Sequence, residues 1–271
     1  MTGPLRLMAV LAHPDDESLG LGGTLARYAR EGIETYVITA TRGEAGRYGN
    51  YLRTDPDRPP VEVVAKKREG ELRAAAQVLG VRQVHFLDYI DGELDRADPL
   101  EATARIAGHV RRIRPQVVVT FAPDGAYGHP DHIAICQFTQ AAMVQAADPG
   151  FPGDHAPHAV SKLYYMAWTE PKWAAYQAAF KELRTAVDGV ERRATPWADW
   201  AITTVVDTMA YWSVAWEAIS CHETQLAIYT KLGDLPPEYH QSLWGSQEFY
   251  RAFSLVNGGR KRETDLFEGL R

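Results

Sequence analysis

Apolar runs and amphipathic segments alternate along the first two thirds of the chain. Short runs of aliphatic and β-branched residues predict buried strands, at 7–12, 35–40, 84–87, 117–121 and 162–167. The segments between them carry apolar residues at helical spacing and predict helices at 18–30, 63–79, 99–112 and 130–144. Strands that alternate with helices in this way form right-handed β-α-β units. The pattern therefore predicts a Rossmann-like α/β fold, in which helices cover both faces of a mostly parallel sheet.

The alternation weakens after about residue 145. All seven tryptophans lie beyond Met166, six of them in helical or loop patterns. They predict a helical, aromatic C-terminal extension that packs on the sheet, unless one or two of the rings line a pocket and stack on a sugar face. We expect a single domain over residues 1–271, with a core at about 5–167 and the extension at about 168–271. The polar segment 47–60 would form a lid or a surface loop.

The composition, with 45% hydrophobic and 24% charged residues, is typical of a globular protein. No apolar run approaches about 20 residues, which predicts that no segment spans a membrane. The N-terminus lacks the cationic start of a secretory signal peptide. The two cysteines, Cys136 and Cys221, lie far apart in the sequence, which favours a reducing compartment. We therefore expect a cytoplasmic protein.

The net charge is −6, and the chain has no long basic run. This balance disfavours a nucleic-acid partner and favours a small-molecule substrate. Exposed apolar surface in the aromatic C-terminal third would permit a homo-oligomer.

Two His-Pro-Asp clusters follow predicted strands at equivalent places in the pattern. One is Ala-His-Pro-Asp-Asp-Glu at 12–17, and the other is Tyr-Gly-His-Pro-Asp-His at 127–132. Ligands of open α/β sheets bind at the carboxyl ends of the strands, so the clusters meet if their two strands are neighbours. Pro130 suits the first position of a helix, which would place His129 at its cap and His132 in its first turn.

Two imidazoles and one carboxylate, with a coordination position left open, form the ligand set of a catalytic zinc site. Asp15 and Asp16 are adjacent, so one can bind the metal while the other accepts a proton from water, a general-base contribution of about 10²- to 10⁴-fold. The spacing does not decide which aspartate has which role. Taken singly, an Asp-Asp-Glu is typical of a helix cap, and a His-x-x-His pair is common at surfaces. Their joint placement at strand ends favours catalysis.

Two other interpretations stay open at this point. The same ligands suit Fe²⁺ in a non-haem oxygenase, although the extra aspartate is better explained by hydrolysis. Gly20, Gly22 and Gly23 follow the first strand, as in a nucleotide-binding module, but they lack the Gly-x-Gly-x-x-Gly register.

This pair of motifs resembles the LmbE-like (PIG-L) family of metal-dependent deacetylases, which hydrolyse N-acetylglucosamine derivatives. The resemblance covers about residues 5–145 well and the C-terminal third thinly. Its motifs are closest to the branch that contains the mycothiol-pathway deacetylase and amidase. It implies Zn²⁺, or Fe²⁺, as the cofactor and removal of acetate from an N-acetylated sugar. A mycothiol-conjugate-type amidase, which cleaves a larger amide, is the alternative.

The resemblance also implies roles for individual residues. His13, Asp16 and His132 match the zinc ligands, and Asp15 matches the general base. His129 matches a histidine that stabilises or protonates the tetrahedral intermediate. Tyr127 matches a tyrosine that assists the oxyanion.

On the substrate side, the resemblance implies four further residues. Arg68 matches an arginine that binds sugar hydroxyls, although it would also suit a solvated helix face. Asp91 matches an aspartate that binds the sugar 3- and 4-hydroxyls, a role for which Asp88 competes. Glu44 resembles a further substrate-side glutamate. His222, in Cys-His-Glu-Thr-Gln, would border the site or pack behind it.

Overall fold

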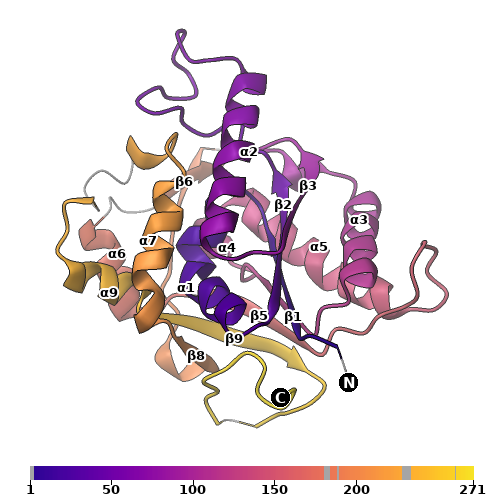
Figure 1. The fold of residues 1–271 in the computed structure, drawn as a ribbon. Helices are drawn as coiled ribbons and strands as arrows, with labels where there is room; N and C mark the ends of the chain where they lie inside the picture. Colours follow the sequence, from indigo (N-terminus) through magenta and orange to yellow (C-terminus); the bar gives the residue numbers. More distant parts are fainter. Residues whose placement is uncertain (1–2, 180–183, 188, 228–232, 260) are drawn as a thin grey trace.

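The computed structural model describes residues 3–179, 184–187, 189–227, 233–259 and 261–271. Its main feature is a seven-stranded sheet in the order β3-β2-β1-β4-β5-β9-β8 (Figure 1). The strands of this sheet are β1 (Arg6–Leu11), β2 (Glu34–Thr41), β3 (Gln83–Tyr89), β4 (Val117–Thr120), β5 (Lys162–Ala167), β8 (Thr204–Asp207) and β9 (Ser246–Ser254). A separate hairpin is formed by β6 (Arg184–Val187) and β7 (Val190–Arg193).

The helices alternate with the strands as predicted. They are α1 (Asp16–Arg30), α2 (Val61–Val78), α3 (Pro99–Ile113), α4 (Gly125–Gly128), α5 (Pro130–Ala147), α6 (Glu170–Ala179), α7 (Trp212–Ser220) and α9 (Pro237–Trp244). Short 3-10 turns occur at Leu94–Arg96, Asp199–Ala201 and Met209–Tyr211. Within the described ranges, no helix is both long enough and apolar enough to cross a membrane.

The five strands β1 to β5 are parallel, which confirms the predicted fold class. Strands β1 and β4 are buried along nearly their whole length because helices cover both faces of the sheet. In Figure 1, α1, α2 and α7 lie on one side of the sheet and α3 and α5 on the other. Strand β1 lies between β2 and β4, so the strand order reverses there. A ligand site is expected at the carboxyl ends of these two strands.

The C-terminal third contributes two strands to the main sheet in addition to its helices. Strand β9 pairs antiparallel with β5, and β8 pairs antiparallel with β9. The aromatic pattern predicted the helices but not these two strands. Trp216 and Trp244 pack around His240, with ring centroids 4.7 and 5.5 Å from the imidazole. By contrast, Trp200 is 88% exposed.

The glycines of α1 are explained by close packing. A Cβ atom added at Gly23 would lie 2.6 Å from Thr208 Cβ, and one added at Gly22 would lie 3.1 Å from Ala215 Cβ. The absence of side chains at both glycines therefore lets α1 pack closely against Thr208, which precedes the 3-10 turn Met209–Tyr211, and against α7. They form no phosphate-binding loop, so this feature gives no support to a nucleotide-binding module.

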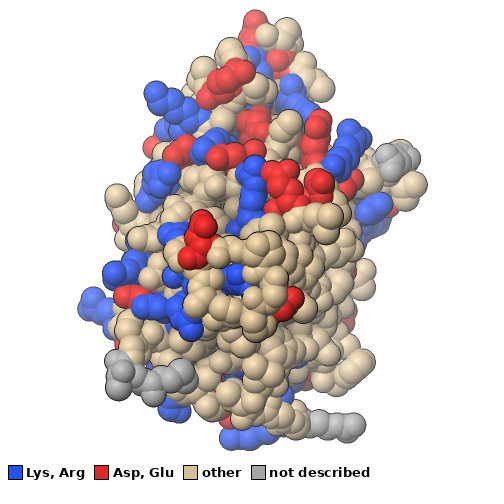
Figure 2. Space-filling view, turned by 90° about the vertical axis from the view of Figure 1, so that its right-hand side faces the viewer, with Lys and Arg blue, Asp and Glu red and all other residues tan. Residues whose placement is uncertain are grey.

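Figure 2 shows the face of the molecule on the α3 and α5 side. Basic and acidic side chains are intermingled in the upper part of this face, and the lower part carries few charges. Neighbouring opposite charges weaken one another's field at a distance. This face therefore presents no broad area of one sign.

A buried ion-pair network ties the C-terminal segment to the sheet. Its centre is the Glu263 carboxylate, which is 1% exposed. The groups that donate to it belong to Lys162, Tyr164, Thr204, Arg251 and Asn257. Burial alone would raise the pKa of Glu263, but the hydrogen bonds from Lys162 and its neighbours lower it to about 2. The charged form of this carboxyl therefore stabilises the folded state.

We expect Glu263→Gln to lower the free energy of unfolding by about 3–5 kcal/mol at pH 7, because it leaves a buried lysine without its counter-ion. The carboxylate's contribution is complete above its ordinary pKa of about 4.5 and is lost as the pH falls toward 2. Denaturant unfolding at pH 7 and at about pH 3.5 should therefore show a smaller difference between variant and wild type at the lower pH. Lys261→Gln, at an exposed ion pair, is the control and should change stability by less than about 0.5 kcal/mol. An equal effect of Glu263→Gln at both pH values would contradict this account.

Candidate active site

The first cluster is shaped by the turn between β1 and α1. Strand β1 ends at Leu11, and Asp16 begins α1. The Asp16 Oδ2 atom accepts the backbone N–H groups of Ala12 and His13, at 3.1 and 2.8 Å. These two bonds hold the carboxylate against the turn, and its Oδ1 atom faces the second cluster.

The second cluster begins α5 as predicted. His129 is the N-cap and Pro130 is the first helical residue. His132 is buried, and its ring stacks on Phe121 with the ring centroids 3.8 Å apart. Its Nδ1–H donates to the Gly125 carbonyl at 3.2 Å. The other ring nitrogen, Nε2, therefore carries a lone pair.

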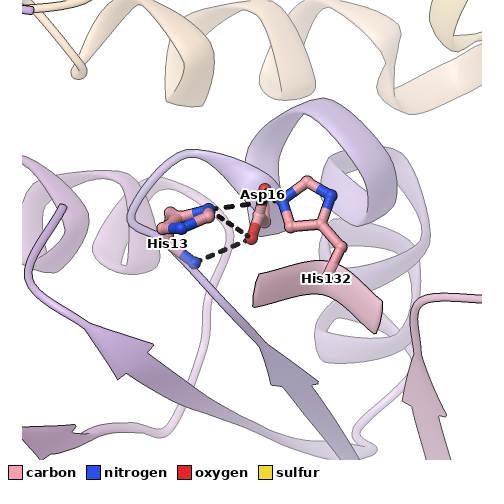
Figure 3. Close-up of side chains that lie close together, drawn as sticks. All are labelled: His13, Asp16 and His132. Carbon is pink, nitrogen blue, oxygen red and sulfur yellow. Dashed lines mark hydrogen bonds and ion pairs between the residues drawn. The ribbon is translucent and has the colours of Figure 1, made fainter. Parts of the chain in front are cut away.

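The predicted metal ligands come together at the carboxyl ends of β1 and β4. Figure 3 shows the Asp16 carboxylate between the imidazoles of His13 and His132. His132 Nε2 lies 3.2 Å from His13 Nδ1 and 3.6 Å from Asp16 Oδ1, and one ligand atom from each residue lies within 4.8 Å of the others. A tetrahedral zinc site with bonds of about 2.0–2.1 Å has ligand atoms about 3.3 Å apart. The spacing of these side chains fits such an ion.

The surroundings of His13 favour positive charge at this place. Its Nε2 atom lies 3.0 Å from Asp131 Oδ2 and 3.1 Å from Asp91 Oδ1. Burial would lower the pKa of His13, but Asp91, Asp131 and Asp16 together raise it well above its ordinary value. Because carboxylates only accept hydrogen bonds, Nε2 keeps its proton and Nδ1 faces Asp16 and His132. A proton or a metal ion supplies the positive charge there, and metal binding would release the proton.

Asp131 lies in the second motif, although the motif pattern predicted no role for it. It is fully buried and accepts the N–H groups of Gly92 and Leu94, at 2.8 and 3.1 Å, as well as the His13 contact. It therefore orients the His13 ring and ties it to the loop after β3. The signal was present in the sequence, since metal-binding histidines usually donate their second N–H to a carboxylate.

We expect Asp131→Asn to weaken zinc binding by about 10- to 100-fold, the usual cost of changing a group that orients a metal ligand. An asparagine offers one acceptor atom only, so its NH₂ group would face either the Leu94 N–H or the His13 N–H. Competition with a metal-indicator dye measures the affinity. Asp95→Asn, at an exposed carboxylate on the neighbouring turn, should leave the affinity unchanged. Unchanged zinc affinity in Asp131→Asn would show that His13 needs no such support.

Asp15 lies beside the ligands in an unusual backbone conformation. Its φ angle is +114°, which costs a residue with a side chain about 1–3 kcal/mol. Its Oδ2 atom accepts a hydrogen bond from Arg68 Nη2 at 3.1 Å. Burial raises the pKa of the Asp15 carboxyl, and the Arg68 charge opposes this rise. The adjacent aspartates thus diverge, with Asp16 toward the two imidazoles and Asp15 toward Arg68.

Arg68 is buried and does not form a solvated helix face. Its guanidinium donates to the carbonyls of Gly43, at 2.6 Å, and Pro14, in addition to Asp15. A Cβ atom at Gly43, whose φ is +67°, would overlap this guanidinium. The described hydrogen bonds of Arg68 thus all go to protein atoms, and its binding of sugar hydroxyls stays a prediction.

The loops after β2 and β3 place Glu44 and Asp91 near the ligands. Glu44 Oε1 accepts the Asp91 N–H at 2.9 Å, and Asp91 Oδ2 accepts the Ala45 N–H at 2.9 Å. Burial would raise the pKa of Asp91, but the neighbouring His13 lowers it below its usual range. Asp88 instead forms an exposed ion pair with Arg42 at 2.6 Å. Of the two aspartates, Asp91 is the one beside the site.

His222 lies behind the first cluster. It is fully buried, and its Nε2 atom lies 2.8 Å from Glu17 Oε1. Glu17 is the last residue of the first motif, and the sequence analysis gave it no role. No local signal could have paired Glu17 with His222, because 205 positions separate them in the sequence.

Tyr127 and His129 form a wall next to the ligands. The Tyr127 ring meets the rings of His129 and His132 edge-on, with centroids 5.8 and 5.4 Å apart. Burial, with the charges of Asp16 and Asp15, raises the pKa of Tyr127, so its hydroxyl keeps its proton. His129 Nδ1 accepts the Asp131 N–H at 3.2 Å. A neutral His129 therefore carries its proton on Nε2, and both residues can donate a hydrogen bond.

Sequence comparison identifies relatives over the whole chain. The family described as PIG-L, GlcNAc-PI de-N-acetylase, matches residues 8–143. A 1D-myo-inositol 2-acetamido-2-deoxy-alpha-D-glucopyranoside deacetylase from Kineococcus radiotolerans is 36% identical, over 98% of this chain and 83% of the relative. A mycothiol S-conjugate amidase from Streptomyces coelicolor is 32% identical, over 100% of this chain and 99% of the relative.

Solved structures share the fold at lower identity. The N,N'-diacetylchitobiose deacetylase from Pyrococcus horikoshii superimposes with a TM-score of 0.67 at 18% identity, over 91% of this chain and 83% of that one. The 4-carboxy-2-hydroxymuconate hydratase GalB from Pseudomonas putida gives 0.71 at 20%, over 94% and 99%. The fold thus supports more than one reaction, and the sequence relatives carry the assignment. With a family match over half its length and 36% identity over nearly all of it, this chain belongs to the PIG-L family of GlcNAc-PI de-N-acetylases.

Proposed function

We propose that this protein is a zinc-dependent hydrolase that removes the acetyl group from an N-acetylglucosamine-type substrate. The observation that carries the proposal is the placement of Asp15. Three ligand side chains, those of His13, Asp16 and His132, have a spacing that fits one divalent cation. Asp15 directly precedes Asp16, and its carboxylate is close enough to interact electrostatically with His13 and Asp16. A base next to a metal-binding set is what amide hydrolysis requires. The names of the sequence relatives support the choice of an acetylated sugar.

The donor set suits zinc well. Imidazole and carboxylate ligands in a set of three leave a position for water or substrate, as in catalytic zinc sites, although Fe²⁺ also accepts these ligands. Bound zinc would polarise the acetyl carbonyl and lower the pKa of water at the site.

The residues of the chain supply the proton transfers. Asp15 accepts one proton from the water molecule whose oxygen attacks the acetyl carbon. The C–N bond then breaks, and the departing nitrogen takes up the proton that Asp15 accepted, or one from His129 when its ring is doubly protonated. Acetate and a free amine are the products, so one water molecule is consumed for each bond broken.

The negative charge that develops on the carbonyl oxygen needs donors that are already in place. Tyr127 keeps its hydroxyl proton, and His129 carries a proton on Nε2. We assign both residues to this role. The N-terminus of α5, at Pro130, adds the positive end of an 18-residue helix near the same position.

We expect the sugar to meet the loops after β2 and β3. Glu44 Oε2 is buried and accepts no hydrogen bond from the described residues, so it offers an acceptor for a sugar hydroxyl. Asp91 lies beside it. Arg68 and His222 lie behind these two acceptors. Arg68 donates to the Gly43 carbonyl and His222 Nε2 contacts Glu17, whereas Arg68 Nε and His222 Nδ1 are buried and have no hydrogen-bond partner among the described residues.

Release of acetate from a panel of N-acetyl sugars, with and without a chelator, tests the proposal. The panel should contain N-acetylglucosaminyl inositol, N-acetylglucosamine and an S-conjugate of mycothiol, because one relative is named an amidase for such conjugates. We expect chelator-sensitive acetate release from the first compound. Release of an amine from the conjugate without acetate would instead assign the amidase reaction. No turnover of any compound by the zinc-loaded protein would refute the proposal.

A further inference from the structure

Three side chains of the C-terminal third reach into the walls of the site. His222 Nε2 contacts Glu17 Oε1 at 2.8 Å. The Thr224 N–H and hydroxyl donate to the two carboxylate oxygens of Glu71, at 2.9 and 2.7 Å. The third side chain is that of Gln225, which contacts the loop after β2. All three side chains are at most 4% exposed, and we refer to His222, Thr224 and Gln225 as the brace.

The brace also holds the loop that follows β2. Gln225 Nε2 donates to the Arg47 carbonyl at 2.9 Å, and the Gly49 N–H donates to the Thr224 carbonyl at 2.8 Å. These bonds connect the beginning of the polar segment 47–60 to Thr224 and Gln225 of the brace. One short stretch of chain thereby joins α1, α2 and this segment.

Asp15 is the residue that most needs such support. Its φ of +114° is unfavourable for a side-chain-bearing residue, so surrounding contacts must hold it. Two contacts do so directly. Glu17 Oε2 accepts the Asp15 N–H at 3.0 Å, and Arg68 donates to the Asp15 carboxylate and to the Pro14 carbonyl.

The two residues that hold Asp15, Glu17 and Arg68, are themselves held in place by contacts with the brace. Glu17 is the partner of His222, and it bridges from that imidazole to the Asp15 backbone. Arg68 lies on α2 three residues before Glu71, the partner of Thr224. Residues three apart lie on the same helix face, so fixing Glu71 fixes the part of α2 that carries Arg68.

We infer that the brace is a positioning device for the candidate general base: His222 and Thr224 hold the Asp15 carboxylate in its catalytic orientation from two sides. This inference rests on the proposed hydrolytic function for the role of Asp15. None of the described hydrogen bonds of the brace residues goes to a predicted metal ligand. Their loss should therefore change the rate of the chemical step and leave metal and substrate affinity largely intact.

Two pairs of variants test the inference by kinetics. His222→Leu removes the donor to Glu17, while His222→Gln keeps an N–H donor on a side chain of similar reach. Thr224→Val removes only the hydroxyl, and Thr224→Ser restores it. We expect His222→Leu to lower kcat about 10²-fold, the usual cost of a small misplacement of a catalytic group. Thr224→Val should show a smaller loss in the same direction. Both should keep KM and zinc affinity near wild type, and Gln and Ser should recover much of the loss.

Glu223→Gln is the matched control. Glu223 lies between His222 and Thr224 but is 66% exposed and pairs with Lys67 on the surface. It should leave kcat unchanged. In an Asp15→Asn background, His222→Leu should lower the residual rate no further, because the group that it positions is already lost. Additive losses in the double variant, or a rise in KM with kcat unchanged, would overturn the inference.

Hydrogen exchange provides a readout that does not depend on turnover. The Ser18 and Leu19 N–H groups donate to the Asp15 carbonyl. Loss of the brace should therefore speed exchange of a peptide covering residues 12–20 by about tenfold or more, in His222→Leu and Thr224→Val but not in Glu223→Gln. Unchanged exchange in both variants would reject the brace even if the enzyme is active. Absence of deacetylase activity in a wild-type protein whose variants do show faster exchange would reject the proposed function alone.

Discussion

Replacing Asp15 by asparagine is expected to lower kcat on an N-acetylated sugar by about 10²- to 10⁴-fold, the range of a general-base contribution. The amide cannot accept the proton of the attacking water. The zinc content should stay at about one ion per chain, because the proposed ligand set consists of three other side chains. Steady-state kinetics and metal analysis of the same preparation measure both quantities.

Asp88→Asn is the matched control for this experiment. Asp88 competed with Asp91 for a role on the substrate side, yet it forms an exposed ion pair with Arg42. Its kcat should lie within about twofold of wild type, as expected for a surface change. If Asp15→Asn lost zinc together with activity, Asp15 would be a ligand and the base would have to be sought elsewhere.

Replacing a predicted metal ligand should instead lower the zinc affinity, and activity should be lost because the metal is lost. We expect His132→Gln to lose zinc affinity by more than the 10- to 100-fold that changes around a ligand cause, and to lose measurable activity with it. Glutamine retains most of the volume of the ring, so the packing on Phe121 is disturbed less than by alanine. Dialysis of the wild type against a chelator should give the same inactive state.

Thermal unfolding provides the second measurement for the ligand variant. Zinc at 100 times its Kd stabilises a protein that binds it by about 2.7 kcal/mol. The wild type should therefore melt at a higher temperature with zinc, and His132→Gln should not respond. His109→Gln, on α3 and outside the candidate ligand groups, should respond like the wild type. A zinc-dependent rise in Tm that persists in His132→Gln would place the metal elsewhere.

The parallel core was predictable from the sequence, because its signals are local. A strand such as β1 is an apolar run that ends at His13-Pro14, and the predicted limits of Lys162–Ala167 agree with those of β5. The cap at His129 and the start at Pro130 also follow from adjacent residues. Strands β8 and β9 were not predicted, because β8 has only four residues and the nine residues of β9 mix polar and aromatic side chains without a clear alternation.

The candidate site shows the same difference between features that local sequence signals predict and features that depend on the rest of the fold. The motifs supplied His13, His132 and the pair Asp15 and Asp16 as candidates, because imidazoles and carboxylates are known metal ligands. The family resemblance then selected Asp16 as the ligand. The motifs could not show that Asp91 points toward His13 while Asp88 points outward, since the two lie only three residues apart, one near the end of β3 and one in the loop after it. The direction of each depends on what the rest of the fold places next to that loop.

The order of residues in the chain was enough to establish the alternating α/β pattern, the two strand-end clusters and the chemistry of their side chains. Each of these depends on neighbours within a few positions. The folded molecule was needed to show that β1 and β4 are adjacent, that Asp131 orients His13, and that His222 supports the Asp15 turn through Glu17. These contacts join residues more than 100 positions apart, and their partners are selected by packing and burial, for which a linear pattern contains no direct signal.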